Sequence, residues 1–150
     1  MGKISHILQT AQDRAKEMNL TYSGAMLPDE AYQIMISAPG AVLVDVRTRA
    51  ELDWVGAIPD ALAIEWAIYP DMRNNPNFIA QLERQVDKEA LLMFICRSGG
   101  RSHYAAMAAT QAGYSDCYNV LEGFEGDKDA NDHRNVLSGW RVRELPWEQS

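Results

Sequence analysis

The chain has 150 residues, of which 47% are hydrophobic and 23% are charged, and its formal net charge at pH 7 is -7. This profile is typical of one folded domain and excludes a disordered chain. No apolar run approaches the roughly 20 residues of a membrane span, and the first residues lack the apolar core of a secretory signal. We therefore expect a cytoplasmic protein with no membrane partner and, because its net charge is negative, no nucleic-acid partner.

The N-terminal residues have the periodicity of an amphipathic helix. Between residues 4 and 18, apolar side chains recur at helical spacing and polar side chains face away from them. Because the polar face is mixed in charge rather than basic, we expect this helix to pack on the edge of the protein rather than on a membrane. Residues 1–20 are assigned to the helix, and residues 21–150 to a single domain.

From residue 21 onward, short apolar runs alternate with helical patterns. Two nearly continuous apolar runs, at residues 41–46 and 90–95, are typical of strands buried on both faces. Weaker strands are predicted at residues 61–66 and 116–120, and helices at residues 28–36, 50–54, 78–86, 101–112 and 137–147. Strands that alternate with helices predict an α/β fold with a mostly parallel central sheet of about five strands and helices on both faces.

Side chains that could bind a ligand or react lie at the carboxyl ends of the two strong strands. Asp45 and Arg47 end the first strand, and Cys96 ends the second. In a parallel α/β sheet these ends meet at one edge, where such folds bind their ligands. The sequence therefore predicts a site around Cys96 at that edge.

The segment that begins at Cys96 has the composition of an anion-binding loop. It consists of Cys96, Arg97, Ser98, Gly99, Gly100, Arg101 and Ser102. Adjacent glycines allow successive N–H groups to face one anion, and the positive end of the following helix points at the same place. The two arginines add positive charge. These surroundings favour the thiolate of Cys96, and a thiolate nucleophile needs no general base when its leaving group is a good anion.

Sulfur abstraction from a sulfane donor such as thiosulfate meets that condition, because sulfite leaves readily. The product would be a cysteine persulfide, whose outer sulfur is attacked by a second nucleophile. The expected partners are a small anionic sulfur donor and an acceptor, which is cyanide or a thiol, a protein thiol included.

Neither a cofactor nor a metal is expected. Cys96 and Cys117 have no metal-binding spacing, and the acidic run from Asp127 departs from a calcium loop at its sixth and twelfth positions. Cys117 lacks the glycines and arginines of the Cys96 segment, so core packing is favoured over a role as a second reactive thiol. The tryptophans are also interpreted as packing residues: Trp54, Trp66, Trp140 and Trp147.

The same residues belong to a longer series of motifs that resembles the rhodanese domain family. The series is Asp45-Val46-Arg47 with Glu51, Gly56-Ala57-Ile58-Pro59, the loop at residues 96–102, Ala112-Gly113-Tyr114, residues 119–123 and Gly139-Trp140. The resemblance covers residues 21–147. It implies an activity like that of thiosulfate:cyanide sulfurtransferases, with Cys96 as the persulfide carrier and the loop through Arg101 as its cradle. It also implies that Asp45, Arg47 and Glu51 support the loop, although Arg47 and Glu51 have the spacing of a simple helical ion pair.

Two other functions stay open. A rhodanese-like fold can serve as a non-catalytic regulatory or partner-binding domain, which the presence of Cys96 disfavours. Cysteine phosphatases and arsenate reductases are the other alternative, and such phosphatases use a loop with five residues between cysteine and arginine. Only four residues separate Cys96 from Arg101. The shorter loop suits a sulfur atom better than a tetrahedral phosphate.

Overall fold

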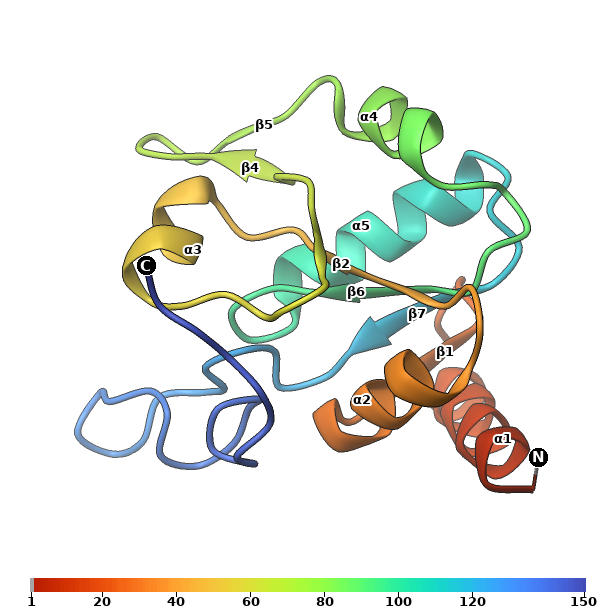
Figure 1. Cartoon of the computed structure of the whole chain (residues 1–150), viewed down its shortest axis with the longest axis horizontal. Helices are drawn as coiled ribbons and strands as arrows, with labels where there is room; N and C mark the ends of the chain where they lie inside the picture. The colour runs from red at the N-terminus through yellow and green to blue at the C-terminus, as the bar shows by residue number, and fades with distance from the viewer. Residues whose placement is uncertain (1) are drawn as a thin grey trace.

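The computed structural model describes residues 2–150 as an α/β fold built on a five-stranded parallel sheet (Figure 1). In spatial order the strands are β1 (Gly24–Met26), β7 (Cys117–Val120), β6 (Leu92–Ile95), β2 (Val42–Asp45) and β3 (Leu62–Ala63). Every neighbouring pair in this sheet is parallel. The central pair matches Val42 with Leu92 and Asp45 with Ile95, so the ends that precede Val46 and Cys96 lie side by side. The predicted fold class is confirmed.

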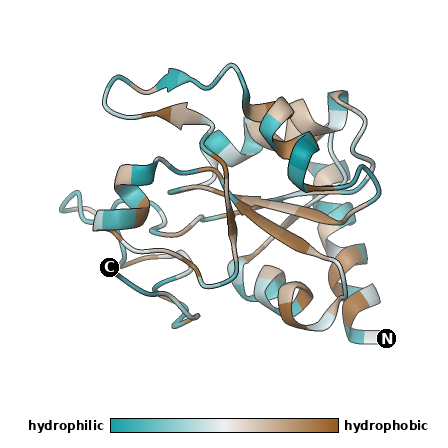
Figure 2. Cartoon of the chain, turned by 45° about the horizontal axis from the view of Figure 1, so that its top comes forward, coloured by the Kyte–Doolittle hydropathy of each residue, from teal (hydrophilic) through white to brown (hydrophobic). Residues whose placement is uncertain are grey.

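Helices cover both faces of the sheet (Figure 1). The helices α1 (Gly2–Glu17) and α2 (Pro28–Ser37) pack on one face, and α4 (Phe78–Gln85) and α5 (Gly100–Gln111) pack on the other. Alternate side chains of β6 pack against the helices on opposite faces of the sheet, because successive side chains of a strand point to opposite faces. Met93 belongs to the core with α1 and α2, whereas Phe94 and Cys96 belong to the core with α4 and α5. Figure 2 shows the hydrophobic strands between these layers.

The edge strand β1 was not predicted, because it is short and lacks branched apolar residues. It lies directly against α1: a Cβ on Gly24 would come within 2.8 Å of the backbone carbonyl of Ala11. Ile7 and Ala11 of α1 are buried in the core beneath. The predicted N-terminal helix is therefore present and packs on the sheet edge, while the division of the chain at residue 20 stays a prediction. Among residues 2–150, no helix is long and apolar enough to cross a bilayer.

The strand predicted at residues 61–66 is much shorter than expected. Its regular part is Leu62–Ala63, although the N–H groups of Ile64 and Trp66 still donate to the carbonyl oxygens of Asp45 and Val46. The chain then forms a small antiparallel hairpin of β4 (Ala67–Ile68) and β5 (Arg73–Asn74). This hairpin lies above the short helix α3 (Arg49–Trp54) in Figure 1.

The helix predicted at residues 137–147 is wrong. This segment consists of turns, because Gly139 and Glu144 adopt positive φ angles of 110° and 59°, which interrupt a right-handed helix. Trp140 is fully buried, and its indole N–H donates to the carbonyl oxygen of Pro146 at 2.7 Å. The chain then returns towards α3: Glu148 pairs with Ala57, which follows that helix, and the Ser150 hydroxyl donates to the carbonyl oxygen of Asp53 at 3.1 Å. The C-terminus therefore lies beside α3 (Figure 1).

Candidate active site

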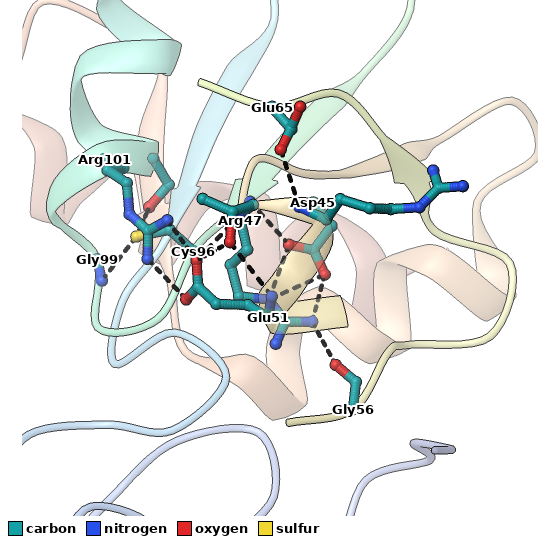
Figure 3. A network of polar contacts seen from close by, with 11 residues as sticks. Asp45, Arg47, Glu51, Gly56, Glu65, Cys96, Gly99 and Arg101 are labelled. Atoms are coloured by element: carbon teal, nitrogen blue, oxygen red, sulfur yellow. Dashed lines mark hydrogen bonds and ion pairs between the residues drawn. The ribbon is translucent and has the colours of Figure 1, made fainter. Parts of the chain in front are cut away.

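Cys96 follows β6 directly, and its sulfur is recessed beneath the loop that leads to α5. The residue is only 1% exposed. Its Sγ accepts the N–H of Gly99 at 3.1 Å and lies 3.3 Å from the hydroxyl of Ser102 (Figure 3 labels Cys96 and Gly99). Among residues 2–150 these are the only hydrogen-bond partners of Sγ, so no acid or base side chain is hydrogen-bonded to it.

The backbone of the loop depends on Gly99, which precedes the first turn of α5. Its φ of 110° lies in the left-handed region that favours glycine. Of the ring of amides that the sequence predicts around the sulfur, the Gly99 N–H is the one that contacts it. Within the described residues, the N–H groups of Gly100 and Arg101 have no protein acceptor, as expected in the first turn of a helix, and neither has that of Ser98 before the helix. They are available to bind an anion.

Asn119 in β7 secures the loop from the neighbouring strand. The Ser102 hydroxyl donates to Asn119 Oδ1 at 2.6 Å, and Asn119 Nδ2 donates to the carbonyl oxygen of Gly99 at 3.3 Å. Sequence reasoning gave Asn119 no role of its own at the site. The available signal was a polar residue inside a buried strand, since buried polar groups normally have a hydrogen-bond partner.

Arg101 is held by Glu51 of α3 rather than left as a free cation. Its guanidinium donates to the two carboxylate oxygens at 2.7 and 2.9 Å (Figure 3). Burial alone would raise the pKa of Glu51, but hydrogen bonds and charge from Arg101, with the N–H of Thr48, lower it to about 2. The pair therefore stays charged at neutral pH and ties the start of α5 to α3.

Replacing Glu51 with glutamine should lower the free energy of unfolding by about 2–3 kcal/mol at neutral pH. The folded carboxyl has a pKa of about 2 against an ordinary value of 4.5, so its contribution is complete above pH 4.5 and disappears as pH falls towards 2. Urea denaturation at a series of pH values should therefore show the two proteins converging over this interval.

Glu83→Gln is the matched control for this experiment. Glu83 also forms an ion pair, with Lys88 at 2.9 Å, but its side chain is 44% exposed. Exposed pairs contribute less than about 1 kcal/mol. Equal losses in the two variants, or a loss in Glu51→Gln that does not change with pH, would contradict the role given to Glu51.

Arg47 pairs with Asp45 and not with Glu51, which corrects the helical pairing left open by the spacing. Its Nε and Nη2 donate to the Asp45 carboxylate at 2.9 and 2.7 Å, and both side chains are buried. Nη2 also donates to the carbonyl oxygen of Gly56 at 2.9 Å (Figure 3). The reason is direction: Arg47 turns into the core, whereas Glu51 turns towards the loop.

The Asp45–Arg47 pair reaches the loop through Phe124. The Arg47 guanidinium lies 4.1 Å from the centre of the Phe124 ring, and the N–H of Phe124 donates to the carbonyl oxygen of Cys96 at 2.8 Å. This contact supports the backbone behind the sulfur.

Arg97 is the exposed cation of the loop. No carboxylate among residues 2–150 lies within ion-pair distance of it. With Arg101 and Glu51 it lines a pocket of about 340 Å³, whose other walls are Thr48, Ala50, Trp54, Val55, Tyr69, Pro70 and Met72. Trp54 was interpreted as a packing residue; it is instead 69% exposed.

Cys117, the second cysteine, lies in the core. It is fully buried, and burial is the main cause that raises the pKa of its thiol to about 11. Cys117 is therefore protonated at neutral pH. No three metal-binding side chains gather into a cluster in the part of the chain from residue 2 to residue 150.

Comparisons with known proteins identify the family to which this parallel α/β fold belongs. The Rhodanese-like domain model matches residues 27–130. The crystal structure of Rv0390 from M. tuberculosis has a TM-score of 0.80 and 42% identity, with 87% of this chain and 100% of that chain covered. The chain belongs to the rhodanese-like domain family.

Sequence relatives agree with this assignment. The "Uncharacterized protein RP600 homolog" of Rickettsia rickettsii is 38% identical over 125 residues, which cover 79% of this chain and 92% of that protein. "Thiosulfate sulfurtransferase GlpE" of Pseudomonas syringae pv. syringae is 35% identical over 100 residues, 66% of this chain and 82% of the relative. Sulfurtransferases are therefore among the proteins that this chain resembles.

Proposed function

We propose that this protein is a sulfurtransferase that carries sulfur as a persulfide on Cys96. The observation that carries the proposal is the position of Sγ, which accepts the Gly99 N–H at 3.1 Å and has no acid or base partner within residues 2–150. Chemistry without proton transfer suits such a sulfur, because a thiolate can displace a good anionic leaving group unaided. The similarity to a protein named thiosulfate sulfurtransferase supports the same choice.

The reaction proceeds in two displacements. First, the Cys96 thiolate attacks the outer sulfur of thiosulfate, the sulfur–sulfur bond of the donor breaks, and sulfite leaves with the electron pair. The product is a Cys96 persulfide with its negative charge on the outer sulfur. Cyanide or a thiolate then attacks that sulfur, the bond to Sγ breaks, and the Cys96 thiolate is restored as thiocyanate or a new persulfide leaves.

The loop amides provide the stabilisation that this cycle needs. The unpaired N–H groups of Ser98, Gly100 and Arg101 would hold the outer sulfur anion, as the first turn of a helix holds other anions. In this proposal the backbone N–H groups bind the outer sulfur, and Arg101 positions the loop through its ion pair with Glu51. We also propose that the protein is located in the cytoplasm, where reducing conditions would keep Cys96 as a free thiol.

Steady-state kinetics with thiosulfate and cyanide test this function. Thiocyanate formation should show ping-pong kinetics, with parallel lines in double-reciprocal plots, because sulfite leaves before cyanide reacts. The same preparation should be given p-nitrophenyl phosphate. Hydrolysis of this ester without thiocyanate formation would indicate a phosphatase, and no turnover of any sulfur donor would indicate a partner-binding domain.

A further inference from the structure

The pocket beside the Cys96 loop has a wall that sulfur abstraction from thiosulfate does not use. Trp54, Tyr69 and Met72 line it, and these side chains are among the large apolar ones that the protein leaves exposed. The rings of Trp54 and Tyr69 lie edge to face, with centroids 6.0 Å apart and planes at 87°. Exposed aromatic side chains gathered around a concave surface are typical of a binding site.

The size of the pocket points to a ligand larger than thiosulfate or cyanide. Its volume of about 340 Å³ lies within the range of small-molecule sites, about 300–1,000 Å³. Cys96 is not part of the wall, whereas Arg97 and Arg101 of its loop are. A ligand body in the pocket would therefore lie next to the loop that holds Cys96 rather than on the sulfur itself.

The charge of the pocket points to an anionic ligand. The Arg101 charge is balanced by Glu51, with 2.7 Å between Nη1 and Oε1. The Arg97 guanidinium is exposed and has no carboxylate partner within the described residues. The pocket thus combines an apolar aromatic wall with one unbalanced positive charge at the side of the loop.

We propose that this pocket binds the sulfur acceptor, a low-molecular-weight organic thiol with an apolar body and an anionic group. The body lies against Trp54 and Tyr69, the anionic group pairs with Arg97, and the thiolate attacks the outer sulfur on Cys96. The bond between the two sulfurs breaks, the Cys96 thiolate takes the electron pair, and the organic persulfide leaves. This inference rests on the proposed function of Cys96.

Discharge of the loaded protein separates the two proposals. The protein is loaded with thiosulfate, freed of excess donor, and mixed with 4-mercaptobenzoate or cyanide while the loss of the bound sulfur is followed by mass. In Trp54→Ala, the efficiency with 4-mercaptobenzoate relative to cyanide should fall about tenfold, because the ring loses its aromatic contact. In Arg97→Gln, the advantage of 4-mercaptobenzoate over benzenethiol should disappear.

Tyr104→Ala is the matched control, because Tyr104 is an exposed aromatic residue of α5 that does not line the pocket. It should leave the ratio unchanged. If Trp54→Ala also leaves the ratio unchanged while cyanide still discharges the protein, the acceptor pocket is wrong and the persulfide function stands. If thiosulfate loads no sulfur on the parent protein, both proposals fall.

Discussion

Replacing Cys96 with serine is expected to abolish sulfur transfer from thiosulfate to cyanide. A serine hydroxyl is not ionised at neutral pH and cannot carry a second sulfur as a persulfide. The first displacement therefore loses its nucleophile, and the second loses its leaving group. Removal of a covalent nucleophile lowers turnover by on the order of a thousandfold or more. Thiocyanate formation at saturating thiosulfate and cyanide measures the effect.

Cys117→Ala is the control for that variant. Cys117 is as buried as Cys96, but its thiol has a pKa raised to about 11, chiefly by burial, and it belongs to the core with α5. Its removal should leave thiocyanate formation nearly unchanged. A Cys96→Ser protein that turns over at the parent rate would contradict the assignment, as would a folded Cys117→Ala protein with no activity.

Replacing Gly123 with alanine should destabilise the protein and distort the loop. A Cβ at this position would lie 2.5 Å from the carbonyl carbon and oxygen of Arg97 and 2.6 Å from the carbonyl oxygen of Cys96. The neighbours are backbone atoms behind the sulfur, so they cannot rotate away as a side chain could. With the cost of a left-handed φ of 67°, we expect the free energy of unfolding to fall by about 3–5 kcal/mol. Urea denaturation measures this change.

Gly40→Ala separates the collision from the backbone strain. Gly40 has a similar left-handed φ of 81°, but a Cβ there would have no heavy atom within 4 Å. Only the strain remains, about 1 kcal/mol. If the two variants lose equal stability, the close packing of Gly123 against the Cys96 segment has no energetic importance. The Gly123 variant should also lose thiocyanate formation, whereas Gly40→Ala should keep it.

The centre of the fold could be predicted because its signals are local. The strands β2 and β6 are short, nearly continuous apolar runs, and a strand buried on both faces produces that pattern wherever it lies in the chain. The cysteine, the two glycines and the helix start follow β6 within a few residues. A sequence therefore indicates a candidate site and the edge of the sheet at which it is expected.

The features that were predicted wrongly, or not at all, depend on contacts between distant parts of the chain. The strand β1 is defined by its pairing with β7 and lies against α1 at Gly24, and the turns after residue 137 include the buried Trp140. Neither contact leaves a periodic pattern, so local propensity is overruled by tertiary packing. The position of Trp54 has the same origin, since its ring lies edge to face with that of Tyr69 in the hairpin that follows β3.

The hydrogen-bond and ion-pair partners at the site also could not be predicted from the spacing of residues in the sequence. Glu51 and Arg101 are 50 residues apart, and their pairing follows from the position of α3 beside the start of α5. Spacing suggested instead that Glu51 pairs with Arg47, four residues away. Asn119 reaches the loop from β7 for a similar reason, because adjacent parallel strands bring their carboxyl ends together.

The most direct test of the persulfide at Cys96 is the mass of the intact protein after incubation with thiosulfate. We expect a gain of one sulfur atom, located on Cys96 by fragmentation, which disappears when cyanide is added and is absent from Cys96→Ser. An unchanged mass in the folded protein, or a sulfur atom located on Cys117, would contradict the account.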